Sequence, residues 1–569
     1  MANLMPIASW TATDVQHFAR RTGFGITPQS AAQVATRLPG PFIDEWIDGY
    51  STAAMEGVLA ERGDVVPVAF IAKLTVGEDV PAVVGDHGFL ITGNDAWRNR
   101  ISYAQAEWFF RMQYSPNQFQ ERLAVFWHVF FATAFEKVDS AILMKQQIDV
   151  FRSNGLGNFT DLLVSVSKDA AMTKWLDCVQ NDATTNQIPN ENYAREVLEL
   201  FSLGVDNGYS QEDILSLAKA LSGWSFYVHP SDWSQHPGNI SDPSAGQPKR
   251  TIFTVYQGQG VPAGSRQWDY LFPHNNSLRK MHPSGASDAT GGSATISFLG
   301  TTFDYSSALT GMAPGEHVLR HITVARPIQC SEFLSKRFLN HFVTPNYTAQ
   351  DVSDFALVIR NNNFHIGTAL KILFKSQYFF ETDKRYCLIN SPVSWMVQAT
   401  RMLGFPLGVA NAMNPRGFPA WRLLISEDAN YDFNFLRGLS FALLNPLGPN
   451  GWADHDAWIN PNTLRWRNYF ASALALIERA NANTMDFAIV PSDISQWLPH
   501  GGPTALDIYN QLIDLLQPAP IPTPVRDGWL SMLFGSTSTP ISSGTLTSFE
   551  PKIRELVFLI LICPQGQAH

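Results

Sequence analysis

Apolar residues recur every three or four positions along most of this chain, the spacing that places them on one face of an α-helix. The first such segment, at 13–22, is broken by Gly23 and Gly25. A longer one is interrupted by the sequence P-G-P at 39–41. The pattern predicts helices over roughly 13–22, 30–60, 95–114, a segment after Pro116, 139–153, 158–168, 189–204, 210–222, 314–325, 331–343, a segment after Thr348, 366–380, 392–403, 462–480, 503–516 and 548–563.

Several of these segments carry polar residues that suit a helix start. A hydroxyl side chain can accept from a backbone N–H in the first turn, and an acidic side chain three residues later can return the bond. The expected caps are Thr11 or Thr13 for the first helix, Ser210 with Asp213, and Thr348 with Asp351.

The periodicity changes between about 226 and 315. This region is rich in Ser, Gly, Pro, Asn and His, and it contains short alternating runs such as T-I-F-T-V-Y and A-T-I-S-F-L-G. Residues 62–96 are rich in valine, glycine and proline and predict an irregular connection, and Q-P-A-P-I-P-T-P (517–524) predicts a proline-rich link. The chain therefore predicts a mainly α, large multi-helix fold with three parts: a helical region at 1–225, an irregular insertion with short strands at 226–315, and a helical region at 316–569 that packs on the first.

The segment P-N-E-N-Y-A-R-E-V-L-E-L-F-S-L-G, at 189–204, combines an apolar face with an unusually acidic one. Ala194, Val197, Leu198 and Phe201 form the apolar face. On another face the charged residues follow at intervals of four, which allows a ladder of ion pairs, with one further carboxylate beside it. These residues are Glu191, Arg195 and Glu199, with Glu196 beside them. The face is either a solvated surface or a set of carboxylates that points into a polar space between helices and does chemistry there.

A histidine marks a second candidate position, in the segment E-R-L-A-V-F-W-H-V-F-F-A-T. Leu123, Phe126, Trp127 and Phe130 have the spacing of a buried stripe, and His128 lies at its edge. Such a histidine is either a core residue with one hydrogen bond or a base or metal ligand.

Composition narrows the class of protein. The chain has 569 residues, of which 45% are hydrophobic, 12% aromatic and only 16% charged, with a net charge of −10. This indicates a globular protein with a large core, and the lack of a basic face argues against a nucleic-acid partner. The four cysteines have no CxxC spacing, so free buried thiols are expected rather than a zinc site or a disulfide framework.

The sequence also bears on the cellular location of the protein. No secretion leader and no apolar run of membrane-spanning length is visible, which predicts a cytoplasmic protein without a membrane span; a secreted protein remains the alternative if a leader was removed.

Two further groups have spacing that suits a cation, though only weakly. His317 and His321 lie one turn apart without a third ligand nearby, and Asp454, His455 and Asp456 form a run that is more typical of a solvated turn. The sequence contains no P-loop, dinucleotide fingerprint, G-x-S-x-G elbow or HExxH motif.

The motifs in this order resemble a bacterial family known as domain of unknown function 1800, over nearly the whole chain. The resemblance rests on H-F-A-R-R-T-G-F-G, E-R-L-A-V-F-W-H-V-F-F-A-T, W-L-D-C-V-Q-N, P-N-E-N-Y-A-R-E-V-L-E-L-F-S-L-G with L-A-K-A-L-S-G-W, F-L-S-K-R-F-L-N-H-F-V, and the N-G-W…W-I-N-P-N-T-L loop. It implies a mainly helical fold and no particular activity. This chain departs from the family in having Phe130 where a second histidine is usual, and in lacking the secretion leader that members commonly carry.

Three interpretations of function stay open. In the first, the protein is an enzyme with a site between two helices, in which His128 is a base or ligand, Glu191, Glu196 and Glu199 are acid/base groups or ligands, and Arg195 clamps an anion. A divalent metal would then be held by His128, Glu196 and Glu199. In the second, the protein binds or assembles with a polymer or protein partner without catalysis. In the third, the polar helix is a buried network that holds the core together.

Overall fold

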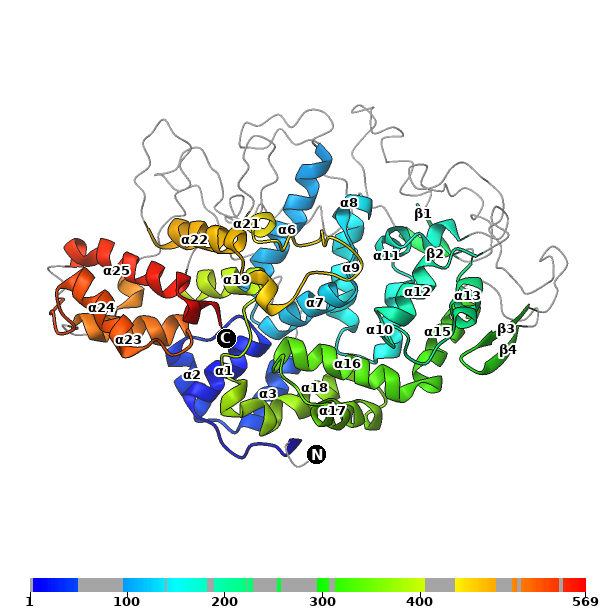
Figure 1. Ribbon diagram of the computed structural model, residues 1–569, viewed down its shortest axis with the longest axis horizontal. Coiled ribbons are helices and arrows are strands. Elements are labelled where there is room, and N and C mark those ends of the chain that lie inside the picture. The colour runs from blue at the N-terminus through cyan, green and yellow to red at the C-terminus, as the bar shows by residue number, and fades with distance from the viewer. Residues whose placement is uncertain are drawn as a thin grey trace.

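The structure is a computed structural model of the chain. It describes residues 4–49, 96–138, 141–181, 189–222, 224–228, 253–256, 294–305, 313–404, 435–476, 494–498, 503–541 and 546–568. The described part is mainly helical, as the periodicity predicts, with short strands inside the predicted insertion (Figure 1).

The helices before the insertion match most of the predicted segments. They are α1 (Ala12–Thr22), α2 (Pro28–Ala35), α3 (Pro39–Asp48), α6 (Ala96–Tyr114), α7 (Gln118–Phe130), α8 (Phe135–Val138), α9 (Ala141–Asn154), α10 (Phe159–Ser167), α11 (Ala170–Trp175), the 3₁₀ turn η2 (Cys178–Gln180), α12 (Asn192–Glu199) and α13 (Gln211–Ala220).

The helices after the insertion form the second helical region. They are α15 (Ala313–Ala325), α16 (Pro327–Phe342), α17 (Ala349–Asn361), α18 (Ile366–Lys375), α19 (Pro392–Met402), α21 (Phe435–Gly438), α22 (Pro461–Ala475), α23 (Ala505–Leu516), α24 (Thr523–Phe534) and α25 (Leu546–Ile562), with 3₁₀ turns η4 (Tyr378–Phe380), η5 (Thr382–Lys384), η6 (His455–Trp458), η7 (Ile494–Trp497) and η8 (Pro564–Gln567).

Two antiparallel hairpins lie within the predicted insertion. Strand β1 (Ser225–Val228) pairs with β2 (Phe253–Tyr256), so that Ser225 is opposite Tyr256. Strand β3 (Ala294–Phe298) pairs with β4 (Thr301–Tyr305), so that Phe298 is opposite Thr301. Strands β2 and β3 are the two alternating runs of the sequence; most of the remaining insertion, and nearly all of the predicted connection at 62–96, lies outside the described residues.

The predicted caps are confirmed. Each hydroxyl accepts from the backbone N–H three residues on, and the acidic side chain there accepts from the backbone of the cap, which satisfies two groups that a helix start leaves unpaired. The pairs are Thr11 with Asp14, Ser210 with Asp213, and Thr348 with Asp351.

Two helices differ from their predicted bounds. Helix α12 is shorter than the predicted 189–204, because the N–H groups of Leu200 and Phe201 both donate to the carbonyl of Glu196, which closes the helix early. Helix α24 was not predicted, since Pro524 and Gly528 argue against a helix. Proline is tolerated there because it lies in the first turn, where its missing N–H has no partner to lose.

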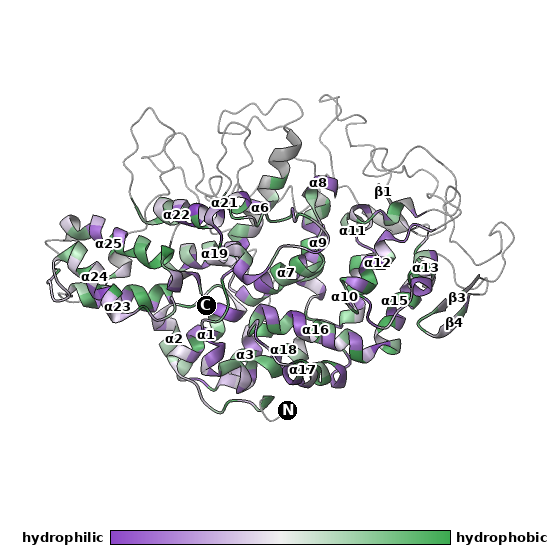
Figure 2. Ribbon diagram, in the orientation of Figure 1, coloured by the Kyte–Doolittle hydropathy of each residue, from purple (hydrophilic) through white to green (hydrophobic). Residues whose placement is uncertain are grey.

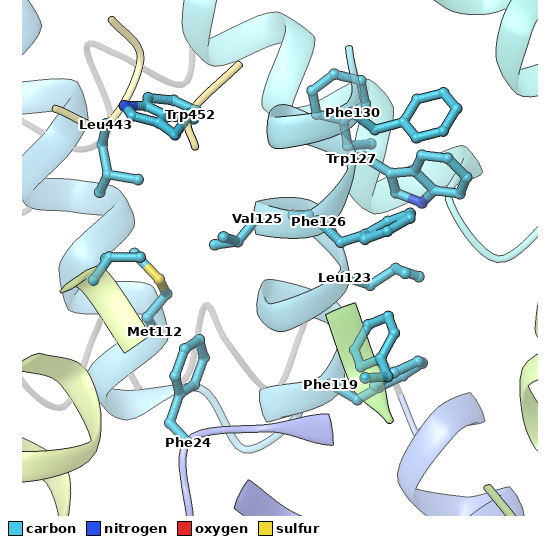
Figure 3. Packing of buried hydrophobic residues seen from close by; sticks show 14 of the residues in the cluster. Phe24, Met112, Phe119, Leu123, Val125, Phe126, Trp127, Phe130, Leu443 and Trp452 are labelled. Atoms are coloured by element: carbon cyan, nitrogen blue, oxygen red, sulfur yellow. The ribbon is translucent and has the colours of Figure 1, made fainter. Parts of the chain in front are cut away.

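Helix α7 runs through the centre of the molecule. All of its residues except Val129 are buried. Leu123, Phe126, Trp127 and Phe130 point to one side of the helix, as the stripe predicts, while Val125 faces the opposite side (Figure 3). The single hydrophobic cluster around it draws on both helical regions.

The other helices are arranged on either side of α7. Helices α23 to α25 lie at one end of the molecule, and α10 to α15 with the β3–β4 hairpin at the other (Figure 1). Helix α3 contacts α18, and α6 contacts α19, so helices from before the insertion pack against helices from after it. Most helices carry hydrophobic and hydrophilic residues on the same helix, as expected for amphipathic segments (Figure 2). No helix in the described part of the chain is long and apolar enough to cross a membrane.

Candidate functional site

His128 lies in the core. Its side chain is fully buried between the rings of Trp108 and Trp452, whose centroids lie 5.4 and 5.2 Å from that of the imidazole. Its Nε2 accepts a hydrogen bond from the backbone N–H of Leu444 at 3.1 Å. Burial lowers the pKa of His128 to about 3, so the ring is neutral, and no carboxylate contributes to the shift. This is the environment of a core histidine, one of the two alternatives that the sequence left open.

The acidic face of α12 forms the predicted ladder at the surface. Arg195 donates to Glu191 at 2.7 Å and to Glu199 at 3.2 Å, and Gln211 of α13 bonds to both Arg195 and Glu191. The side chains of Glu191, Arg195 and Glu199 are 36%, 35% and 21% exposed, so water shares in their solvation. Burial, and then the charge of Glu199, raises the pKa of Glu196. These are partly solvated ion pairs rather than an enclosed acidic pair.

The described contacts of His128 and those of the α12 carboxylates do not include each other. Within the described ranges, no group of three or more His, Cys, Asp or Glu side chains lies close enough together to hold a metal ion. The shared site of His128, Glu191, Arg195, Glu196 and Glu199 therefore stays a prediction, as does a metal on His128, Glu196 and Glu199.

The most specific sequence motifs serve to hold α12 in place. Asn181 accepts from the backbone N–H of Asn190 at 3.0 Å and donates to the carbonyl of Ala218 at 2.6 Å. Asn192 donates to the carbonyl of Leu176 at 3.2 Å. The W-L-D-C-V-Q-N segment thus hydrogen-bonds directly to the start of α12 and the end of α13, and its polar residues have a structural use.

The two weak cation candidates have other contacts. His317 and His321 both pack against the ring of Phe303, at 5.2 and 5.0 Å. In the second group, the side chain of Asn340 on α16 donates to Asp454 and bonds to Nε2 of His455, each at 3.1 Å, which attaches this loop to the helix.

A different group of charged residues stands out, because it is buried and has no acidic partner. Arg21 of α1 and Arg122 of α7 are 0% and 2% exposed. Arg21 donates through Nη2 to the carbonyl of Lys384 and to Sγ of Cys387, and Arg122 donates through Nη1 to the hydroxyl of Ser394. Nε and Nη1 of Arg21 and Nε of Arg122 are buried without any partner. A guanidinium has five N–H donors, so both side chains keep donor capacity for a further group.

Two histidines complete this group, which we call the cationic cluster (Arg21, Arg122, His341 and His455). Nε2 of His341 and Nδ1 of His455 are buried without a partner. Both histidines are partly exposed as residues, so the cluster approaches the surface on their side. The four residues come from four separate parts of the chain: α1, α7, α16 and η6.

The four side chains act on one another electrostatically. Burial lowers the pKa of Arg122 to about 9, and the charge of Arg21 adds to this effect. Burial, and then the charges of Arg122, His455 and Arg21, holds the pKa of His341 well below its usual range. Burial is also the main reason that the pKa of His455 is lowered, although Asp454 and Asp456 oppose the shift. The positive charge of the two arginines therefore lies where water is scarce, and it helps to keep the two histidines neutral.

Other buried or half-buried arginines of the chain have a purely structural role. Arg20 donates to the carbonyl of Gln517, Arg401 to that of Gln113, and Arg467 to the carbonyl of Asn390 at 2.9 Å and the amide oxygen of Gln567 at 2.7 Å. Each links distant segments through backbone oxygens. Arg20 also acts on Arg21 and His17, so what sets Arg21 and Arg122 apart is that the charges of both act on His341.

The sequence contained an indication that three members of this cluster are buried, although it did not indicate that they meet. Arg21, Arg122 and His341 each follow a buried phenylalanine by three positions on the same helix: Phe18, Phe119 and Phe338. Residues three apart share a helix face, so these polar side chains had to point toward the core. Basic residues in the last turn of a helix suit its dipole, which explains the position of Arg20 and Arg21 in α1 but not their burial.

A family model described as "Protein of unknown function (DUF1800)" matches residues 17–565. The chain belongs to this family. The match spans α1 to η8, and it includes the whole cationic cluster and the ladder of α12. Comparison with curated proteins and with solved structures gave no match.

The DUF1800 match confirms the resemblance seen in the sequence, and its description assigns no activity. The function of the chain is therefore inferred from the chemistry of the residues that the fold brings together.

Proposed function

We propose that this protein binds a ligand through an oxyanion, a phosphate or sulfate group, at the cationic cluster. The observation that carries the proposal is the set of unpartnered, buried N–H groups on Arg21 and Arg122. An unpaired buried charge is strongly unfavourable, so an anion that pairs with both guanidinium groups stabilises the fold as well as binding to it.

The geometry favours a tetrahedral oxyanion over a lone carboxylate. A planar carboxylate is satisfied by one guanidinium edge, whereas the cluster offers unpartnered donors on two arginines from separate helices, α1 and α7. Ser394, which receives the bond from Arg122, lies in the first turn of α19, where the helix dipole also favours negative charge.

The test is thermal unfolding of the full chain in chloride buffer while phosphate, sulfate or acetate is added. Binding at a concentration of about 100 times Kd raises the free energy of unfolding by about 2.7 kcal/mol. We expect phosphate and sulfate to raise the Tm more than acetate does, and Arg122→Met to abolish this rise. In ligand-free buffer the same variant should be as stable as the parent or more so, because replacing a buried, poorly paired charge by an apolar side chain is often neutral or stabilising.

Arg401→Met is the matched control, because Arg401 is half-buried, has no acidic partner among the described contacts and has a pKa lowered by burial to about 10. Sulfate stabilises many proteins without binding to a site, and this variant measures that background. Equal responses of Arg122→Met and Arg401→Met, or no response of the parent protein to any oxyanion, would sink the proposal.

This proposal belongs to the binding interpretation of the chain rather than to the His/Glu enzyme. A catalytic or metal role for His128 and the α12 carboxylates is a separate proposal that is tested by metal analysis of the purified protein. A cytoplasmic location and the absence of a nucleic-acid partner also remain proposals, on the sequence evidence alone.

A further inference from the structure

Cys387 is the one cysteine of the four that is not buried. Cys178, Cys330 and Cys563 are all buried, and burial raises the pKa of the Cys330 and Cys563 thiols, which makes them poor nucleophiles. Cys387 is partly exposed, so reagents in solution can reach it.

The Cys387 sulfur lies against the cationic cluster. Its Sγ is 3.4 Å from Nη2 of Arg21, and the thiol can donate to the carbonyls of Lys384 at 3.1 Å and Val343 at 3.3 Å. Val343 directly follows α16, two residues after His341. The sulfur is therefore placed between Arg21 and the end of the helix that supplies His341.

The sulfur has a positively charged neighbour in a partly exposed position. Reactive cysteines are found in electropositive, partly exposed surroundings of this kind. Arg21 also keeps Nε and Nη1 unpartnered and buried, so it can accept a second negative charge close to the sulfur. No other cysteine of the chain combines exposure with an arginine donor at its sulfur among the described hydrogen bonds.

We propose that Cys387 is a redox modification site of the oxyanion pocket formed by the cationic cluster, and that the bound oxyanion protects it from hydroperoxides. The thiolate attacks one peroxide oxygen, an S–O bond forms as the O–O bond breaks, and the leaving oxygen takes a proton and departs as water or an alcohol. Sulfur loses two electrons and the peroxide gains them. The resulting sulfenate places its oxygen beside Arg21, where it competes with the oxyanion. The protection by ligand rests on the proposed function, whereas the reactivity of the thiol does not.

The experiment treats the full-length protein with a small excess of hydrogen peroxide in the presence of a sulfenic-acid trap, and measures the adduct on each cysteine by mass spectrometry. We expect Cys387 to be labelled first. Arg21→Met should slow its labelling by about tenfold, because it removes the positive charge beside the sulfur, and Arg21→Lys should retain part of the rate because it keeps a positive charge. Arg401→Met is the control for a lost arginine elsewhere.

Phosphate added to the parent protein separates the two proposals. If phosphate slows labelling of Cys387 alone, both stand. If Cys387 is labelled first but phosphate has no effect, the reactive thiol stands and the oxyanion site is wrong. If the parent protein labels Cys387 no faster than Cys178, Cys330 or Cys563, the thiol proposal is overturned, and this comparison needs no variant to fold.

Discussion

At the scale of single residues, two arginines with similar partners lie in very different surroundings. Arg195 bridges two carboxylates on a partly exposed face, whereas Arg152 pairs with Glu121 at 2.9 Å where both side chains are 4% and 2% exposed. We expect Arg195→Ala to lower the free energy of unfolding by about 0.5 kcal/mol. Arg152→Ala should lower it by about 3–5 kcal/mol, because the buried carboxylate of Glu121 loses its guanidinium partner and keeps only the weaker, neutral hydrogen bond from Trp108 among its described contacts. A urea titration of each variant measures both.

A loss of several kcal/mol for Arg195→Ala would contradict the solvated ladder and would revive α12 as an enclosed site. The small loss that we expect would instead remove the main reason for placing catalysis on this helix, since the ladder would then be an ordinary surface network.

His128 provides a test that depends on pH. Its pKa is about 3 in the folded chain and about 6.5 in the unfolded chain, so between these values the unfolded chain binds more protons. Stability from this residue is therefore complete above pH 6.5 and falls as the pH is lowered, by up to about 1.4 kcal/mol per pH unit.

The comparison of the parent with His128→Asn isolates this effect, because the amide oxygen can still accept from Leu444. Asp169, whose pKa burial raises to about 7, contributes a slope of the opposite sign between about pH 4 and 7, but it does so equally in both proteins. We expect the parent to lose its advantage over the variant as the pH falls from about 6.5. A difference that is constant with pH, measured by urea unfolding, would show that His128 does not titrate as the burial implies.

At the scale of elements, Asn181 connects the start of α12 to the end of α13. It is 2% exposed, and Asn181→Ala would leave the N–H of Asn190 and the carbonyl of Ala218 without their bonds. Each unsatisfied buried group costs about 1–3 kcal/mol, so we expect a loss of at least about 2 kcal/mol and faster amide exchange in both helices. Asn462→Ala, which removes an exposed amide from the start of α22, is the comparison. Equal losses in the two variants would contradict a special role for Asn181.

The helices show how much of the structure could be predicted from the sequence. Helix starts at Thr11, Ser210 and Thr348 were predictable, because capping depends on residues three positions apart. Helix α24 was not, since its proline is harmless only at the position where the helix begins. The cationic cluster was also missed, because a residue's helix face can be read from local spacing, whereas the meeting of α1, α7, α16 and η6 depends on long-range packing.

At the scale of the whole molecule, Arg20 and Arg21 tie the first helix to segments far along the chain. Arg20 donates to Gln517, 497 positions away, and lies 4.6 Å from the centre of the Tyr386 ring. We expect Arg20→Met to speed amide exchange around 514–517 and 384–387 while leaving α12 and α13 unchanged. Arg20→Lys should do so less, because it keeps a donor for the carbonyl. Hydrogen exchange measured by mass spectrometry tests this expectation. A change in exchange confined to α1 would show that Arg20 does not stabilise the segments around 514–517 and 384–387.

These long-range bonds also have a consequence for protein synthesis. A ribosome adds about 5–20 residues per second, so roughly 25–100 s pass between the emergence of Arg20 and that of Gln517. Through that interval α1 carries two arginines whose acceptors have not all been made, and the four parts of the chain that form the cationic cluster cannot yet all meet. An incomplete chain that stops before η6 lacks His455 and thus the complete cluster. The capacity to bind an oxyanion would then distinguish finished molecules from nascent ones.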